Sequence, residues 1–453
     1  MDPALPKYLA LAKAISGDIE AGLLRPGDRL PPQRELADFL GVTLGTITRG
    51  YREAIDHGFL KGEVGRGTYV AEPKTVPTPL RVSADYPEGV IDLSCAYPLY
   101  GSEPDLAATL RKLSERGDIQ NLLYYQPSEG MPRHRAAGAG LMRRLGLDVS
   151  PGEIIVTGGS QHALNVIFSA IARPGDVILT EALTFPNVKA LAAVMHLKLE
   201  GVEIDDRGLI PEALAAACRQ DRVKALYFIP TLHNPTTAIL PEKRKRKIAA
   251  IARDFDIALI EDENYRLLAP DPPPLTAEFA RERTFLIGGV SKCLAGGLRI
   301  AFNVCPPGYF KTVLLNVAST MIMATPLAAE IASTWIEDGT LDIIIQGKRK
   351  EAASRCNLAR EILKPFSFMA HENGFFVWLQ LPDPWRSGRF IQECFRRGLV
   401  LPPTESFAPG PRPIPNAVRI SSSAAPNPAA WEKALRTMAD ILAGPPSTGS
   451  YLL

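Results

Sequence analysis

The sequence predicts an α/β protein with a mainly parallel sheet, preceded by a small helical domain and followed by a smaller α+β part. Helical and strand-like segments alternate through the middle of the 453-residue chain, which is typical of βαβ units. Three short apolar strands there begin near Ala225, Leu259 and Phe285, and each leads into polar residues. Open α/β sheets bind ligands at such strand ends, so these polar residues are candidates for one site.

Length and composition define the class of protein. A chain of 453 residues suits two or three domains, and 46% hydrophobic with 22% charged residues is typical of a soluble globular protein. A net charge of +2 does not by itself indicate a nucleic-acid partner, so any basic patch must be local. The six cysteines include no Cys-x-x-Cys pair, and we expect neither a metal site nor disulfides. No signal segment or membrane-length apolar run is present, so we expect a cytoplasmic protein without a membrane partner.

The first seventy residues have the outline of a helix-turn-helix. Residues 7–22 show apolar side chains at helical spacing, and residues 30–40 form a short helix with proline in its first turn. Gly41 and Val42 interrupt that helix, and Thr43 is a suitable N-cap for a second one that ends near His57. Residues 59–70 then predict a small hairpin, or wing.

Residues 7–70 resemble the winged helix-turn-helix of the GntR regulators. The matching motifs are Leu30-Pro31, Arg34-Glu-Leu-Ala37, Gly41-Val-Thr43, Thr46, Tyr51, Gly58-Phe-Leu60 and Gly65-Arg-Gly-Thr68. The resemblance implies that the second helix enters the major groove of a double-stranded DNA operator. The residues implied to face DNA are Arg34, Thr43, Thr46, Thr48, Arg49, Arg66 and Gly67. Many relatives carry arginine where this chain has Leu44, followed by Gly45, so the base-reading residues stay open. A protein-docking role for a small helical domain with a hairpin is the alternative.

The remaining boundaries follow from composition. Residues 72–90 are rich in proline and lack apolar periodicity, which predicts an extended linker after a domain at 1–71. The large domain is expected at 91–443, with its small C-terminal part at about 340–443. A tail at 444–453 completes the chain.

The large domain carries a strand, a glycine turn and a helix at residues 154–164. Backbone N–H groups at the start of such a helix form a ready phosphate site, although a tight βα connection has the same pattern. Helices near 211–219 and 241–254 alternate with the strands. The charge run Lys243–Lys247 is expected to form the solvated face of the second of these helices.

The polar groups at the three strand ends match the needs of pyridoxal 5′-phosphate. A lysine amine condenses with its aldehyde, and a carboxylate pairs with its pyridinium nitrogen. A phenol and an amide can hydrogen-bond the ring hydroxyl, while arginine and serine can hold the phosphate. Lys292 alone would be taken for a surface lysine. Lys292 becomes a candidate for binding the cofactor because other suitable polar residues occur at the same strand ends: Asn234, Asp262, Tyr265, Ser291 and Arg299.

These motifs, in this order, resemble those of fold-type I aminotransferases. The resemblance implies that Lys292 is the Schiff-base lysine and that Asp262 binds the ring nitrogen. It also implies the other cofactor contacts: Asn234 and Tyr265 at the ring oxygen, Phe185 stacked on the ring, and Gly159, Ser160, Gln161, Ser291 and Arg299 at the phosphate. For Phe185, ordinary core packing is the alternative.

Two further features belong to the same resemblance. Arg419 falls where aminotransferase-like proteins bind a substrate carboxylate, and an arginine in mid-strand would otherwise be awkward to bury. Tyr124 and Tyr125 are candidates to reach a phosphate in a neighbouring subunit, with a plain core or interface role as the alternative.

Over essentially its whole length the chain resembles the MocR subfamily of GntR regulators. The resemblance implies a homodimeric transcriptional regulator that senses pyridoxal phosphate, or a small amino acid or amine effector, through an aldimine at Lys292. An aminotransferase with an accessory N-terminal domain is the alternative, so enzymatic activity stays open and is not the expectation. A DNA-binding module whose large domain is only a scaffold is a third class. The sequence names neither the effector nor the operator.

Overall fold

The computed structural model describes residues 6–20, 23–25, 27–56, 59–63, 67–70, 86–87, 89–101, 103–410 and 414–445. The chain divides into two compact units, residues 1–78 and residues 79–453. Most of the predicted linker and tail, as well as Arg66, lie outside the described residues. No helix in the described part of the chain is long and apolar enough to cross a membrane.

The N-terminal unit is a helix-turn-helix followed by a hairpin. Its elements are α1 Lys7–Glu20, α2 Gln33–Leu40, α3 Leu44–Asp56, β1 Leu60–Glu63 and β2 Gly67–Val70. Gly41 ends α2 in the left-handed conformation, which glycine adopts without strain. At Gly50 a Cβ would come 2.7 Å from Leu11 Cδ2, so this glycine lets α3 pack closely on α1. The apolar residues recognised at helical spacing, among them Leu11 and Ile15, form the core of this unit.

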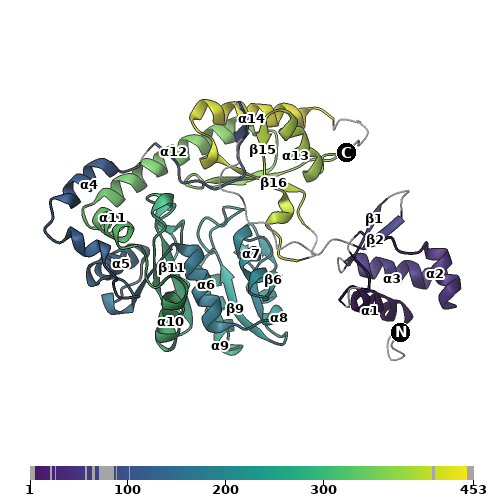
Figure 1. Ribbon diagram of the computed structural model, residues 1–453. Coiled ribbons are helices and arrows are strands. Elements are labelled where there is room, and N and C mark those ends of the chain that lie inside the picture. The colour runs from purple at the N-terminus through teal and green to yellow at the C-terminus, as the bar shows by residue number, and fades with distance from the viewer. Residues whose placement is uncertain are drawn as a thin grey trace. The chain divides into compact units, whose positions relative to one another are not determined.

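A seven-stranded sheet forms the centre of the large unit (Figure 1). Its strand order is β4-β12-β11-β10-β9-β5-β6, and only β12 runs antiparallel to its neighbours. The strands are β4 Ile154–Thr157, β5 Val177–Glu181, β6 Lys198–Val202, β9 Val223–Phe228, β10 Ala258–Asp262, β11 Thr284–Gly289 and β12 Ala301–Val304. The predicted mainly parallel α/β fold is therefore confirmed.

Helices cover both faces of this sheet, and alternate strand residues fill separate hydrophobic cores on its two sides. Ile155 and Ile287 belong to one core, while Ile154 and Leu286 belong to the other. Neighbouring side chains of a strand point to opposite faces, which explains why these strands are apolar throughout. The helices before the C-terminal part are α4 Leu106–Ser114, α5 Pro132–Leu145, α6 Ser160–Ile171, α7 Pro186–Val194, α8 Pro211–Ala217, α9 Glu242–Asp254, α10 Phe310–Met321 and α11 Pro326–Glu337.

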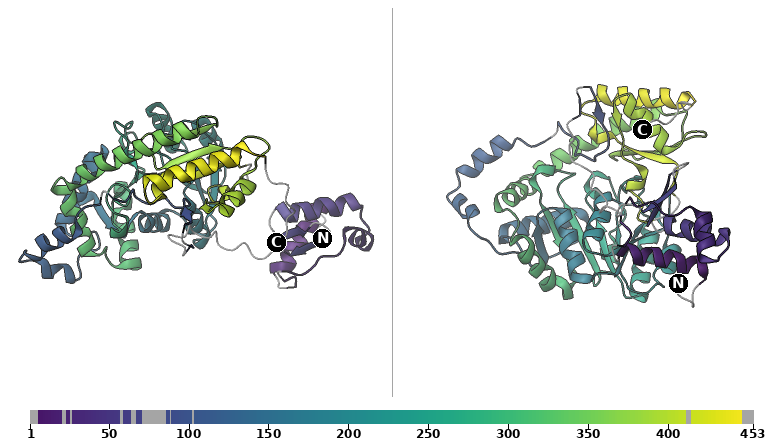
Figure 2. Two further views of the ribbon diagram at one scale, coloured as in Figure 1. Left: turned by 90° about the horizontal axis from the view of Figure 1, so that it is seen from above. Right: turned by 45° about the vertical axis from the view of Figure 1, so that its right-hand side comes forward.

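The C-terminal part is built on a small antiparallel sheet, in the order β13-β14-β16. Its elements are α12 Thr340–Ile362, β13 Phe368–Ala370, β14 Phe376–Gln380, α13 Ser387–Arg396, β15 Leu399–Val400, β16 Ala417–Ser421 and α14 Pro428–Ala443. Figure 2 shows α12 and α14 side by side across this part. Two short pairs complete the strands: β3 Ile91–Asp92 pairs with β15, and β7 Ile204–Asp205 pairs with β8 Gly208–Leu209. Strand β3, near the start of the large unit, thus forms a sheet with a strand of the C-terminal part.

The expectation that Lys243–Lys247 forms a solvated face of α9 is wrong for its central residue. Lys245 is fully buried, and its Nζ lies 3.6 Å from Glu261 Oε1 and 3.6 Å from Glu263 Oε1. Glu261 lies in β10, and Glu263 directly follows its last residue. A charged side chain on the inner face of a helix becomes tolerable when buried carboxylates face it, and the helix sequence alone does not reveal them.

Candidate functional site

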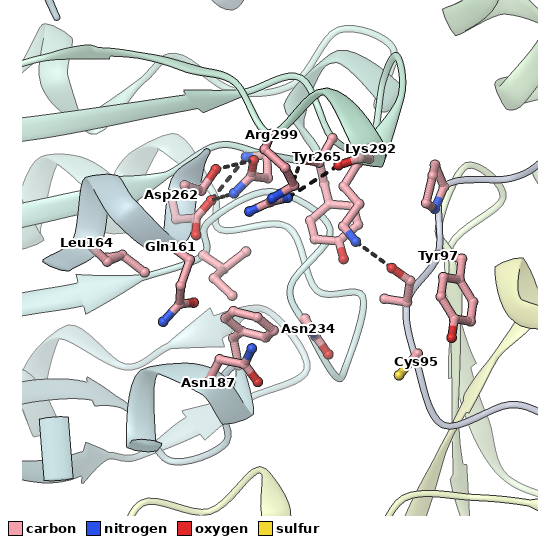
Figure 3. A pocket seen from close by; sticks show the side chains of 18 of the residues that line it. Cys95, Tyr97, Gln161, Leu164, Asn187, Asn234, Asp262, Tyr265, Lys292 and Arg299 are labelled. Carbon is pink, nitrogen blue, oxygen red and sulfur yellow. Dashed lines mark hydrogen bonds between the residues drawn. The ribbon is translucent and has the colours of Figure 1, made fainter. Parts of the chain in front are cut away.

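A cavity of about 600 Å³ opens at the carboxyl ends of β9, β10 and β11 (Figure 3). The predicted residues that line it are Ser160, Gln161, Phe185, Asn234, Asp262, Tyr265, Ser291, Lys292, Arg299 and Arg419. Further lining residues come from the segment Cys95–Tyr100, and from Asn187 and Asn264. The cavity therefore brings together residues that lie far apart in the sequence.

Asp262 is fixed by hydrogen bonds at the last position of β10. Tyr227 Oη donates to its Oδ2 at 2.9 Å, and the Asn264 side-chain amide donates to its Oδ1 at 2.5 Å. The carbonyl oxygen of that amide accepts from Ser160 Oγ at 2.8 Å. Burial raises the pKa of Asp262, while the bond from Tyr227 opposes the rise. A buried carboxylate with fixed orientation is suited to bind the protonated nitrogen of a ring.

Hydrogen-bond donors gather at the N-terminus of α6. Gly159 precedes the helix with a φ of 85°, a conformation that favours glycine. A Cβ on Gly159 would lie 2.6 Å from Arg299 Nη2, so the glycine allows the guanidinium to approach the start of the helix. Arg299 also donates to Ser291 Oγ at 3.2 Å. Backbone N–H groups, an arginine and two serine hydroxyls make a donor set that fits a phosphate.

Lys292 lies past the end of β11 and points into the cavity. Its Nζ donates to the carbonyl oxygen of Ala96. Burial, together with the positive charges of Arg419 and Arg299, lowers the pKa of Lys292 to about 8. The amine is therefore more often unprotonated, and hence nucleophilic, than an exposed lysine at the same pH.

Arg419 is fully buried in the middle of β16. It donates to Asn234 Oδ1 at 3.1 Å and to the carbonyl oxygen of Ser94, while its Nε has no hydrogen-bond partner. No carboxylate in the described part of the chain forms an ion pair with it. Burial lowers its pKa to about 10. A buried guanidinium with neutral partners and one unpaired N–H is suited to bind a carboxylate.

Tyr265 and Phe185 bound the cavity beside these charges. Tyr265 packs edge-on against Phe375 and Phe376, and burial raises the pKa of its phenol. Phe185 is half-buried at the start of α7, lines the cavity and also packs against the core, so its two predicted roles are both physically open. Tyr124 and Tyr125 do not line the cavity, and their side chains are 62% and 81% exposed.

Sequence reasoning missed the wall formed by residues 95–100, as well as Tyr227 and Asn264. Tyr227 lies on strand β9 and Asn264 lies two residues after Asp262, within the strand-end segments that the sequence indicates, so their positions offered a signal. The wall had no such signal, because it follows a two-residue strand and carries no recognisable motif.

The predicted DNA-facing residues lie on α2, α3 and the wing. Arg34, Thr43, Thr48 and Arg49 are exposed, and Thr46 is half-buried. The hydroxyls of Thr43 and Thr46 are 2.9 Å apart at the start of α3, and Thr48 Oγ1 donates to Gln33 Oε1 at 2.7 Å. The guanidinium of Arg49 lies 3.9 Å from the centre of the Tyr8 ring. Gly67, at the start of β2, has a φ of 124°, and a Cβ there would lie 2.9 Å from Arg29 Nε.

The fold and the cavity define a protein of the aminotransferase class, and comparison with known families agrees. Residues 88–438 match the family of class I and II aminotransferases, to which the chain therefore belongs. Residues 7–70 match the gntR family of bacterial regulatory proteins. The chain thus joins a GntR helix-turn-helix to an aminotransferase domain, as the resemblance predicted.

Three known proteins illustrate this similarity. The uncharacterized HTH-type transcriptional regulator YdeF of Bacillus subtilis is 29% identical, over 92% of this chain and 90% of its own length. The HTH-type transcriptional regulator TauR of Rhodobacter capsulatus is 26% identical, over 95% and 96%. The kynurenine aminotransferase of Pyrococcus horikoshii is similar in fold, with a TM-score of 0.72 and 23% identity over 78% of this chain and 91% of its own. The protein is a transcriptional regulator with a pyridoxal phosphate aminotransferase-like domain.

The cavity residues fit this cofactor. Ser160, Ser291, Arg299 and the start of α6 would hold the phosphate, and Asp262 would face the ring nitrogen. The oxygen Oε1 of Gln161 is buried without a hydrogen-bond partner among the described residues, which leaves it available to a ligand. When bound, the cofactor supplies an aldehyde that condenses with amines, and Lys292 is the cavity's amine.

Proposed function

We propose that this protein is a MocR-type regulator that senses pyridoxal phosphate, or a small amino acid or amine, at Lys292. The observation that carries the proposal is a buried, electrostatically unmatched Arg419 in the same cavity as Lys292, in a chain that also carries a DNA-binding domain. A DNA-binding protein of this kind acts in the cytoplasm, where bacterial DNA lies.

Lys292 and Arg419 would recognise different groups of the ligand. Lys292, with a pKa of about 8, has roughly one amine in ten unprotonated at pH 7 and can react with an aldehyde. Arg419 offers its unpaired Nε, and the carbonyl that it contacts can be exchanged for a carboxylate. An amino acid would therefore present its amine near Lys292 and its carboxylate to Arg419.

The DNA-binding part of the proposal uses α3 and the wing. Hydroxyls at the start of α3, from Thr43 and Thr46, suit phosphate oxygens, and the exposed Arg34 and Arg49 suit phosphates or guanine edges. Arg66, which lies outside the described residues, remains a predicted contact of the wing. The stacking of Arg49 on Tyr8 would hold that side chain in one orientation before DNA arrives.

A homodimer is the proposed assembly. The segment 106–125 exposes apolar side chains that a second copy could cover, among them Leu106, Leu123, Tyr124 and Tyr125. Leu123 is 80% exposed and Tyr125 is 81% exposed, values that are costly for a monomer when such residues adjoin in sequence. Sedimentation of the full-length protein tests this assembly.

Aminotransferase activity is the second candidate function, because the cavity holds a lysine, a ring-nitrogen carboxylate and a carboxylate-binding arginine together. One experiment separates the two functions. The purified protein, loaded with pyridoxal phosphate, is titrated with amino compounds while the cofactor spectrum and operator affinity are followed. A regulator changes both without sustained turnover of a keto acid. Steady transamination without any effect on DNA binding would establish the enzyme instead.

A further inference from the structure

The segment Cys95–Tyr100 forms the wall of the cavity beside Lys292 and Arg419. The carbonyl of Ser94 accepts from Arg419, and the carbonyl of Ala96 accepts from Lys292. Figure 3 shows Cys95 and Tyr97 on the opposite side of the cavity from Asp262 and Gln161. The side chains of this wall therefore adjoin the place where an amine and a carboxylate would bind, and lie away from the phosphate end.

The charges of the cavity limit what can bind at that wall. Its charged lining residues are Asp262, Lys292, Arg299 and Arg419. The cofactor would engage the first three of them, through its ring nitrogen, aldehyde and phosphate. Arg419 alone remains, and one guanidinium matches one carboxylate. A second carboxylate or ammonium on the ligand would meet no opposite charge among the remaining lining residues, which is unfavourable.

The wall itself presents an aromatic surface. The rings of Tyr97 and Tyr100 have centroids 5.9 Å apart and are tilted by 37°, and Pro98 lies between them in the chain and also lines the cavity. Tyr100 remains 61% exposed. Aromatic rings gain most from offset or edge-on contact with another ring, and an apolar ligand group would remove exposed ring surface from water.

We propose that the effector is an α-amino acid with a single carboxylate and an uncharged, preferentially aromatic, side chain that packs on Tyr97 and Tyr100. This inference rests on the proposed sensing function and narrows the class of ligand for the same site. Dicarboxylic and diamino acids are disfavoured by charge. Amino acids without a side chain, such as γ-aminobutyrate, gain nothing from the two tyrosines.

The test uses the full-length protein loaded with pyridoxal phosphate. L-phenylalanine, L-alanine, L-glutamate, L-lysine and γ-aminobutyrate are titrated, with dissociation constants from calorimetry and parallel measurement of operator affinity. Burial of the larger side chain is expected to make phenylalanine bind about tenfold tighter than alanine or more. Glutamate and lysine are expected to bind more weakly than alanine.

Variants of the wall locate the preference. The double variant Tyr97→Ala, Tyr100→Ala should weaken phenylalanine binding by about tenfold and change alanine binding by less than about twofold. The variant Tyr97→Phe, Tyr100→Phe keeps both rings and should retain the preference, which guards against loss through misfolding. Phe395→Ala is the matched control, because Phe395 lies on α13, is 60% exposed and does not line the cavity.

The possible failures are distinguishable. If glutamate, lysine or γ-aminobutyrate binds more tightly than phenylalanine and changes operator affinity, the effector class is wrong and the sensing function stands. An unchanged preference for phenylalanine in the double alanine variant also overturns the assignment to Tyr97 and Tyr100. If no amino compound changes either the cofactor spectrum or operator affinity, the sensing function itself fails.

Discussion

Gly289 is the position at which a single methyl group should disturb the cofactor site most directly. It is the last residue of β11, and a Cβ built on it would lie 1.8 Å from Asn264 Oδ1 and 2.3 Å from Ser160 Oγ. Both atoms belong to the chain of hydrogen bonds that orients Asp262. Gly289→Ala must therefore push Asn264 away, and overpacking of this kind costs about 1–3 kcal/mol of stability.

The same displacement should weaken cofactor binding. A lost hydrogen bond to a charged group costs about 1.5–3 kcal/mol, which corresponds to about tenfold or more in the dissociation constant of pyridoxal phosphate. Urea unfolding and fluorescence titration measure the two effects. Gly308→Ala is the matched control, because a Cβ there would meet no atom within 4 Å, and neither quantity should change. If Gly289→Ala bound the cofactor as tightly as the unmodified protein, the hydrogen bonds that orient Asp262 would not contribute to cofactor affinity.

Three further predictions concern single charged residues. Lys292→Ala should leave no cofactor attached to the protein after borohydride reduction, and attachment elsewhere on the chain would contradict this assignment. In the unmodified protein, the rate of attachment should increase about fivefold between pH 7 and pH 8, because the reactive amine is the unprotonated form and its pKa is about 8. Arg49→Ala or Arg66→Ala should weaken operator binding by about 1–3 kcal/mol if the arginine reaches a base edge, whereas a phosphate contact would weaken all sequences alike and reduce the salt dependence. Gel shifts at two salt concentrations, with Arg436→Ala on α14 as control, decide between these outcomes. Glu330→Gln should destabilise the large unit by about 1.5–3 kcal/mol in urea at pH 7, because this buried carboxylate pairs with two half-exposed arginines and a histidine. Burial raises the pKa of Glu330, but the hydrogen bonds from those partners outweigh burial and lower it. The contribution of Glu330 to the free energy of unfolding is therefore present at neutral pH and is lost as the pH falls through the lowered pKa of the folded state. The variant should lose that part of the pH dependence of stability.

Much of the fold was predictable because its signals are local. Apolar strands followed by polar residues predicted the parallel sheet and the edge where ligands bind, and the structure has β9, β10 and β11 paired in parallel at that edge. The cavity collects Asn234, Asp262, Tyr265 and Lys292, as those strand ends suggested.

The remainder depends on contacts between distant segments. Lys245 was expected to be solvated because it lies in a run of basic residues, yet Glu261 in β10 and Glu263 just after it face this lysine. Helical periodicity places a residue on one face, but it does not reveal which strand that face meets. The wall at Cys95–Tyr100 was missed for the same reason, since its position depends on Arg419 and Lys292, far along the chain.

The residues just before and at the start of this wall connect the cavity to the predicted linker. Residues 91–96 follow the predicted linker directly in the sequence. Their attachments in the large unit include the pairing of β3 with β15, a hydrogen bond from Ser421 N–H to the carbonyl of Leu93, and the bonds that Ser94 and Ala96 accept from Arg419 and Lys292. A ligand that engages either cation competes with one of those carbonyls. Under the proposed sensing function, ligand binding and the position of this segment would be thermodynamically linked, and the coupling would act equally in both directions. The strand pairing between β3 and β15 uses backbone atoms only, so it need not change with the ligand. The stretch from Ser94 to Ala96, which carries both carbonyls, is therefore where the proposed ligand would act on the segment that follows the linker.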